Sequence, residues 1–173
     1  MKLINYILLL VISLAVLGCG AYSFTGISLP PETKTFQVNY FQNYAGSNPG
    51  STVEPGLERD FTIVLQELIL NQTSLDLVES KGDLVYEGEI TEYRISPMTS
   101  TANNTAAQNR LTIGVMVRYF NRLDEESDFE QRFSFYYDYP GSSQLVGSQK
   151  DTAIAEIFER ITQDIVNKTL ANW

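Results

Sequence analysis

The stretch LTIGVMVRYFNRLDEESDFEQRFSFYYDY, residues 111–139, decides the fold. In each half an apolar side chain recurs at alternate positions: Leu111, Ile113, Val115, Val117 and Tyr119, then Phe129, Phe133, Phe135, Tyr137 and Tyr139. A period of two is typical of a strand with one buried face. The acidic segment 121–128 joins the two halves, so the stretch predicts an antiparallel hairpin with one apolar face.

Three more strands and two helices are predicted around this hairpin. In chain order they are strand 34–41, helix 55–72, strands 75–78 and 84–95, and, after the hairpin, helix 151–169. Phe36, Val38 and Tyr40 are expected on one face of the first strand, and Pro97 is expected to end the strand that begins at residue 84.

Every long strand has one apolar face, and each helix has one apolar stripe. The predicted fold class is therefore α+β. We expect a two-layer sandwich, in which a mixed, mostly antiparallel sheet of four to five strands carries both helices on one face. The aromatic side chains of 133–139 are interpreted as core. The alternative is an exposed aromatic face for a partner or an acyl chain.

The first residues of the chain predict export. Lys2 precedes an apolar run from Leu3 to Leu17, and Gly18 is followed by Cys19, the only cysteine. The run is shorter than the ~20 apolar residues of a spanning helix and is typical of a secretory signal. Val-Leu-Gly-Cys19 resembles a bacterial lipobox, which predicts cleavage after residue 18 and attachment of diacylglycerol and an N-acyl chain to Cys19. The alternatives are a plain signal peptide with a chance cysteine, an uncleaved anchor and a buried core cysteine.

Three regions follow from this interpretation: a signal peptide at 1–18, an acylated tether at 19–33 and a single α/β domain at 34–173. Cleavage leaves 173 minus 18, or 155, residues, enough for one domain with a hydrophobic core. No aspartate follows Cys19, and no acidic cluster that resembles a surface-export signal is present nearby. By the sorting rules that these features resemble, the predicted location is the cell outer membrane, lipid-anchored on the periplasmic side.

The charge excludes two classes of partner. Twelve Lys and Arg face 21 Asp and Glu, and loss of Lys2 with the signal leaves 11 minus 21, or −10. Nucleic-acid binding needs Lys and Arg to displace counterions, and anionic lipid surfaces attract basic segments. We therefore expect no nucleic-acid partner, and membrane binding only through the acyl chains.

No catalytic or metal site is predicted. The absence of histidine excludes Ser-His-Asp and Cys-His arrangements and histidine zinc sites. Glu87 and Glu89 have the spacing of a carboxylate pair, but a solvated strand face is the simpler interpretation, because a glycosidase needs a cleft around them. Segment 124–128 lacks the ligand spacing and the glycine of an EF-hand loop, so it is interpreted as a charged turn. We expect a non-enzymatic protein without a cofactor other than the acyl groups on Cys19.

Two arginines of the hairpin are candidate anion contacts. Arg118 and Arg132 lie on the non-core faces of their strands. In-phase pairing places Arg118 opposite either Glu130 or Arg132. The first register gives a cross-strand ion pair. The second leaves two like charges that an anion such as a lipid phosphate would bridge. The structural register with Glu130 is favoured.

A long polar loop supplies two further candidates. Residues 96–109 are mostly Ser, Thr, Ala and Asn, and a loop of about this length is often functional. Arg94 and Arg110 flank it and are candidate anion contacts as well.

Several short motifs together resemble one family. They are Cys19-Gly-Ala-Tyr-Ser-Phe-Thr-Gly26, Phe36-Gln-Val-Asn-Tyr-Phe-Gln-Asn43, Leu57-Glu-Arg-Asp-Phe-Thr62, Gly82-Asp-Leu84 with Gly88-Glu-Ile-Thr-Glu-Tyr93, Asn109-Arg-Leu-Thr-Ile113, and Asp164-Ile-Val-Asn167 with Asn172-Trp173. In this order and spacing they resemble LptE-type lipopolysaccharide-assembly lipoproteins, in the branch found in Bacteroidetes. Ala21 departs from the usual Cys-Gly-Tyr-Ser-Phe start as an insertion.

The resemblance implies a two-layer α/β fold and a partner, the outer-membrane β-barrel LptD, whose lumen the lipoprotein plugs. It also implies a role in assembling that barrel and contact with lipopolysaccharide in transit. Family contacts to lipopolysaccharide are basic residues, and the candidates by position are Arg94, Arg110, Arg118 and Arg132. The alternative hypothesis is a free-standing periplasmic lipoprotein that binds a small amphiphile or glycan between the sheet and loop 96–109.

Overall fold

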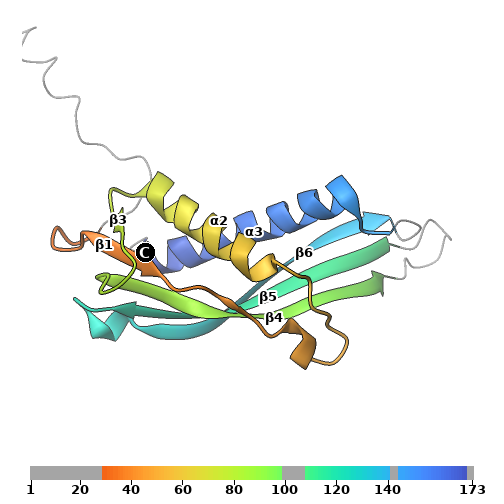
Figure 1. Cartoon of the computed structure of the whole chain (residues 1–173), viewed down its shortest axis with the longest axis horizontal. Helices are drawn as coiled ribbons and strands as arrows, with labels where there is room; N and C mark the ends of the chain where they lie inside the picture. Colours follow the sequence, from red (N-terminus) through yellow and green to blue (C-terminus); the bar gives the residue numbers. More distant parts are fainter. Residues whose placement is uncertain (1–28, 99–107, 141–143, 171–173) are drawn as a thin grey trace, which may run out of the picture.

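A computed structural model describes residues 29–98, 108–140 and 144–170. Two helices cover one face of a six-stranded sheet (Figure 1). The predicted fold class, α+β with two layers and both helices on one face, is confirmed. The signal peptide, Cys19 and most of loop 96–109 lie outside the described residues.

Three long antiparallel strands form the centre of the sheet. They are β4 (Leu84–Met98), β5 (Gln108–Asn121) and β6 (Phe129–Pro140). The predicted hairpin is confirmed, with β5 and β6 paired from Tyr119 opposite Phe129 to Gln108 opposite Pro140.

The prediction that Pro97 ends β4 is wrong, since the strand runs to Met98. The carbonyl of Tyr93 accepts a hydrogen bond of 3.0 Å from the amide of Thr52, so the polar groups of Tyr93 point away from β5. Pro97, four residues further on, has the same orientation. Its missing N–H therefore costs no hydrogen bond to β5.

Three short strands complete the sheet. They are β1 (Thr35–Val38), β2 (Gln42–Asn43) and β3 (Asp76–Leu77), and all their pairings are parallel. The sheet order is β3-β1-β4-β5-β6, with β2 also on β4. The sheet has six strands because β2 forms as a separate two-residue strand.

One predicted core position of the first strand is wrong. Tyr40 is 54% exposed, whereas Phe41 is fully buried. The chain leaves the ladder after Val38 and rejoins β4 at Gln42, so the alternation shifts by one residue between the two short strands.

Asp83 joins β1 to the start of β4. One carboxylate oxygen accepts hydrogen bonds from the amide of Lys34 (3.0 Å), the amide of Thr35 (2.9 Å) and the hydroxyl of Thr35 (2.9 Å). The preceding Gly82 leaves space for this contact, because a Cβ there would lie 2.7 Å from the backbone nitrogen of Gln37. The Gly-Asp pair of the sequence motif therefore has a structural role.

The helices are α2 (Leu57–Gln72) and α3 (Gly147–Leu170). Gly56, with φ of +84°, precedes α2, so this helix starts two residues after Pro55. α3 starts four residues before the predicted residue 151. The remaining elements are the 3₁₀ turns η1 (Ala45–Ser47) and η2 (Glu125–Ser127).

The core lies between the two layers and is rich in aromatic rings. Phe61 of α2 makes edge contacts with Phe41 (5.0 Å between centroids) and with Phe158 of α3 (5.1 Å). Phe133 and Tyr139 of β6 are buried, while Phe135 and Tyr137 are half-buried against the core. The interpretation of the aromatic stripe as core is confirmed for its two ends, and its middle remains partly open.

Candidate functional site

The sheet face that lies away from α2 and α3, which we call the outer face, carries charged side chains from all three long strands. Alternate residues of each strand point to it, because their neighbours face the helices. The charged members are Glu87, Glu89, Glu92, Arg94, Arg110, Arg118, Glu130, Arg132 and Asp138. All four arginines singled out from the sequence therefore share one surface.

Arg118 is surrounded by carboxylates from both neighbouring strands. Its Nε lies 3.1 Å from Glu87, its Nη2 3.0 Å from Glu89 and its Nη1 3.7 Å from Glu130. The hydrogen bonds to Glu89 and then to Glu87 raise the pKa of Arg118. The register places Arg118 opposite Glu130, so the structural interpretation of this pair is confirmed.

Glu92 is the most buried carboxylate of the outer face and lies between two arginines. It follows a β-bulge after Ile90 and is 9% exposed. Arg94 reaches it at 2.6 Å, and Arg132 reaches it from β6 by crossing over Gly114. A Cβ at Gly114 would lie 2.9 Å from Cζ of Arg132, so the absence of a side chain lets the guanidinium cross in this position.

Arg110 forms a two-pronged pair with Asp138, at 2.7 and 2.8 Å. Its guanidinium also stacks on the ring of Tyr136, 3.6 Å from the centroid. The hydrogen bond from Arg110 lowers the pKa of Asp138. The pair is held in a fixed geometry by the ring and by the cross-strand register.

These contacts decide what the outer face can do chemically. Each candidate arginine already has a carboxylate partner, so an incoming phosphate has to share or displace that partner. Arg94 and Arg132 are the most exposed of the four side chains, at 43% and 42%, and both contact the same carboxylate, Glu92. Glu87 and Glu89 are joined by Arg118, so the two carboxylates form part of an ion-pair cluster.

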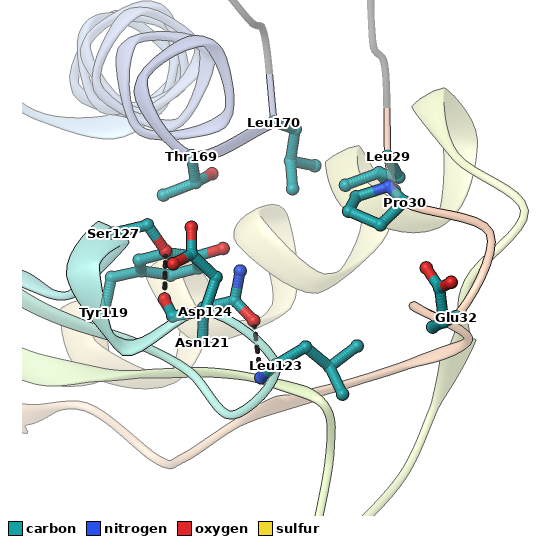
Figure 2. A pocket seen from close by; sticks show the side chains of 10 residues that line it. All are labelled: Leu29, Pro30, Glu32, Tyr119, Asn121, Leu123, Asp124, Ser127, Thr169 and Leu170. Atoms are coloured by element: carbon teal, nitrogen blue, oxygen red, sulfur yellow. Dashed lines mark hydrogen bonds between the residues drawn. The ribbon is translucent and has the colours of Figure 1, made fainter.

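A cavity of about 380 Å³ lies at the end of the domain where the chain enters from residue 29. Figure 2 shows that its walls come from the segment 29–32, the turn after β5 and the end of α3. Leu29, Leu123 and Leu170 give it apolar surface, while Glu32 and Asp124 add carboxylates. Sequence reasoning missed this cavity, because its lining segments are far apart in the chain.

The acidic turn beside the cavity is held by its own hydrogen bonds. The carboxylate of Asp128 accepts a hydrogen bond of 2.7 Å from the amide of Asn121, and the hydroxyl of Ser127 donates to the carbonyl of Asp124 at 2.8 Å.

In 29–98, 108–140 and 144–170, no group of three or more metal-ligating side chains is found. In the same ranges, no helix is long and apolar enough to cross a membrane.

Two comparisons concern the fold alone. The structure of the hypothetical protein CT253 from Chlamydia trachomatis is 11% identical, with a TM-score of 0.53, and the match covers 81% of this chain and 99% of that chain. The structure of rare lipoprotein B from Shewanella oneidensis is 13% identical, with a TM-score of 0.41, over 76% of this chain and 89% of that chain. The similarity to CT253 supports the same two-layer architecture for this chain.

The family comparison is specific. No curated protein matches the chain. The model of the family described as "LptE: Lipopolysaccharide-assembly" matches residues 33–169, which include all the described strands, α2 and all but the last residue of α3. The match covers far more than half of the chain, so the chain belongs to the LptE lipopolysaccharide-assembly family.

Proposed function

We propose that this chain is a non-enzymatic outer-membrane lipoprotein, acylated at Cys19, that fills the lumen of an LptD-type β-barrel. In this role it helps the barrel to assemble and assists delivery of lipopolysaccharide to the cell surface. The match of the family model to residues 33–169 carries the proposal. The acyl chains hold the domain on the periplasmic side.

The outer face supports a place inside a polar lumen. Its charges are paired across neighbouring strands, as between Arg118 and Glu89 or Arg110 and Asp138. A plug has to present polar surface to a polar barrel interior, and paired charges lower the cost of displacing water there. The paired charges of the outer face meet both needs.

The lipopolysaccharide contacts are proposed in an order that follows from the ion pairs. Arg94 ranks first, since its side chain is the most exposed of the four, at 43%. Arg132 and Arg110 rank next, since each pairs with one carboxylate: Arg132 with Glu92, and Arg110 with Asp138. Arg118 ranks last, because three carboxylates already neutralise it.

Co-purification tests the proposal. The tagged full-length protein, extracted in mild detergent, is expected to bring down a large outer-membrane barrel in a one-to-one complex. A folded and acylated protein that comes down without any barrel would contradict it.

The cavity at the end of the domain favours a second candidate function. A space of about 380 Å³ with leucine on its walls suits part of a small amphiphile. A free-standing lipoprotein of this kind would purify as a single chain, without a barrel, and would retain a lipid after native extraction.

A further inference from the structure

The outer edge of β6 lacks a strand partner within the described chain. The sheet order ends at β6, which pairs only with β5. β6 is 12 residues long, whereas β3 at the opposite end of the order has two. A long open edge is a template for pairing with another strand, and soluble proteins usually cover or shorten such edges.

The hydrogen bonds of the sheet identify which backbone groups face this edge. The carbonyl of Tyr86 accepts from Asn39 beside β1, so Tyr86 faces β1 and Glu87 faces β5. Glu87 is opposite Arg118, and Arg118 therefore faces β4 while its neighbours face β6. Val117 and Tyr119 are opposite Gln131 and Phe129, so the odd-numbered residues of β6 face β5. The N–H and C=O groups of the even-numbered residues therefore face the open edge, and these residues are Glu130, Arg132, Ser134, Tyr136 and Asp138.

We propose that a second copy of this chain pairs with the edge, β6 against β6 in antiparallel orientation, with Phe135 opposite Phe135. This register lets residues 130–140 of both copies pair. On the outer face it puts Arg132 of each copy opposite Asp138 of the other, and Ser134 opposite Tyr136. On the core side it puts Phe133 opposite Tyr137. Opposite charges and aromatic rings directly across an antiparallel pair are favourable.

Other registers lose this complementarity or shorten the paired stretch. Centring the pair on Ser134 puts Glu130 opposite Asp138, which are like charges. Centring it on Arg132 puts that arginine opposite itself. Centring it on Phe133 puts Arg132 opposite Ser134, so the ion pair between the copies is lost. Centring it on Gln131 puts Glu130 opposite Arg132, but then only residues 129–133 of the strand can pair. The register centred on Phe135 is therefore the one that combines opposite charges with a long paired stretch.

The position of α3 over β6 is compatible with a two-fold axis through Phe135. Arg160 of α3 lies over the ring of Phe135, at 5.8 Å, and is exposed. Glu156 and Asp164 are one turn away on either side and are exposed as well. A two-fold axis through Phe135 makes α3 antiparallel to its copy, which brings Arg160 within reach of Glu156 and Asp164 of the second copy. The half-buried rings of Phe135 and Tyr137 lose exposure in the pair.

Charge-swapped copies test the proposal on the full-length acylated protein. One copy carries Arg132→Glu with one affinity tag, and the other carries Asp138→Arg with a second tag. In a pair of Arg132→Glu copies, the new glutamate faces Asp138 at both contacts. In a pair of Asp138→Arg copies, the new arginine faces Arg132 at both contacts. The mixed pair has opposite charges at both contacts. We expect each variant to self-associate about tenfold more weakly than the parent, and the mixed pair to recover parental association. Equal self-association of all forms, or no recovery in the mixed pair, would overturn the proposal.

Disulfide formation tests the register. Phe135 opposite itself would form a non-hydrogen-bonded pair with Cα atoms about 4.5 Å apart, within disulfide range. Phe135→Cys is expected to give a covalent dimer in isolated membranes, and Ser134→Cys is not. The parent protein, with Cys19 alone, controls for the native thiol. Equal cross-linking of both variants, or cross-linking of Phe135→Cys only to a different protein, would refute the register. Self-pairing concerns copies outside a barrel, because the proposed complex holds one copy per barrel. The barrel is not needed for either result, so these experiments separate self-pairing from the proposed plug function.

Discussion

Replacing Asp83 with alanine should destabilise the domain in a pH-dependent way. The substitution leaves three donors without their acceptor: the amides of Lys34 and Thr35 and the hydroxyl of Thr35. A hydrogen bond to a charged group is worth about 1.5–3 kcal/mol, and a neutral one about 1 kcal/mol. Because this corner is partly exposed and water can replace the carboxylate, we expect a total loss of about 2 kcal/mol at pH 7.

The sign of the pH effect follows from the same contacts. The amide of Lys34, then the hydroxyl and the amide of Thr35, lower the pKa of Asp83 from its ordinary value of 3.8. A lowered pKa contributes stability that is present above the unfolded value and is lost as the pH falls through the folded value. The difference between parent and Asp83→Ala should therefore be full at pH 7 and should shrink below about pH 4.

Urea unfolding followed by far-UV circular dichroism at pH 7, 5 and 3 measures this difference. Asp76→Ala is the matched control, because Asp76 is an exposed aspartate of the neighbouring β3, and its loss should stay below about 0.5 kcal/mol. A loss at Asp83 no larger than that of the control, or one that is equal at pH 7 and pH 3, would refute the reasoning.

Three other predictions concern the outer face, the core and the anchor. Arg118→Met should cost about 1 kcal/mol in urea unfolding, because it leaves three carboxylates together, while Arg59→Met, which removes one exposed pair, should cost nothing measurable. Equal effects would contradict a structural role for Arg118. Phe61→Ala should cost about 3–5 kcal/mol, against less than about 1 kcal/mol for Ile63→Ala on the exposed side of α2. Similar losses would argue against the aromatic core. Cys19→Ala should abolish labelling by radioactive palmitate and leave the precursor uncleaved, and persistent labelling would rule out acylation at this residue.

The long strands could be predicted from sequence because each has one buried face over many residues. The alternation in 111–119 and 129–139 determines which side chains face the core, because only one face of each strand is apolar. The shift at Tyr40 could not be predicted in this way. It arises from the departure of the chain from the ladder between β1 and β2, and the two-residue β2 is too short to give a periodic signal.

The candidate site was only partly predictable. In-phase pairing of the core faces allowed either Glu130 or Arg132 opposite Arg118, and the favoured pairing with Glu130 is confirmed. The position of Arg132 over Gly114 and the burial of Glu92 depend on the bulge after Ile90, which has no marker in the sequence. Gly82-Asp83 is part of a family motif, and the structure supplies a physical reason for it: a close approach and three hydrogen bonds to the segment 34–35.

The most direct test of the central claim is the amount of newly made lipopolysaccharide at the cell surface after this protein is depleted. Pulse labelling followed by surface-specific capture measures that amount, with the total newly made lipopolysaccharide as the internal reference. If the chain works in lipopolysaccharide assembly, the surface fraction should fall as the protein disappears and should recover when the full-length protein is supplied again. An unchanged surface fraction in cells that have lost the protein would contradict the account.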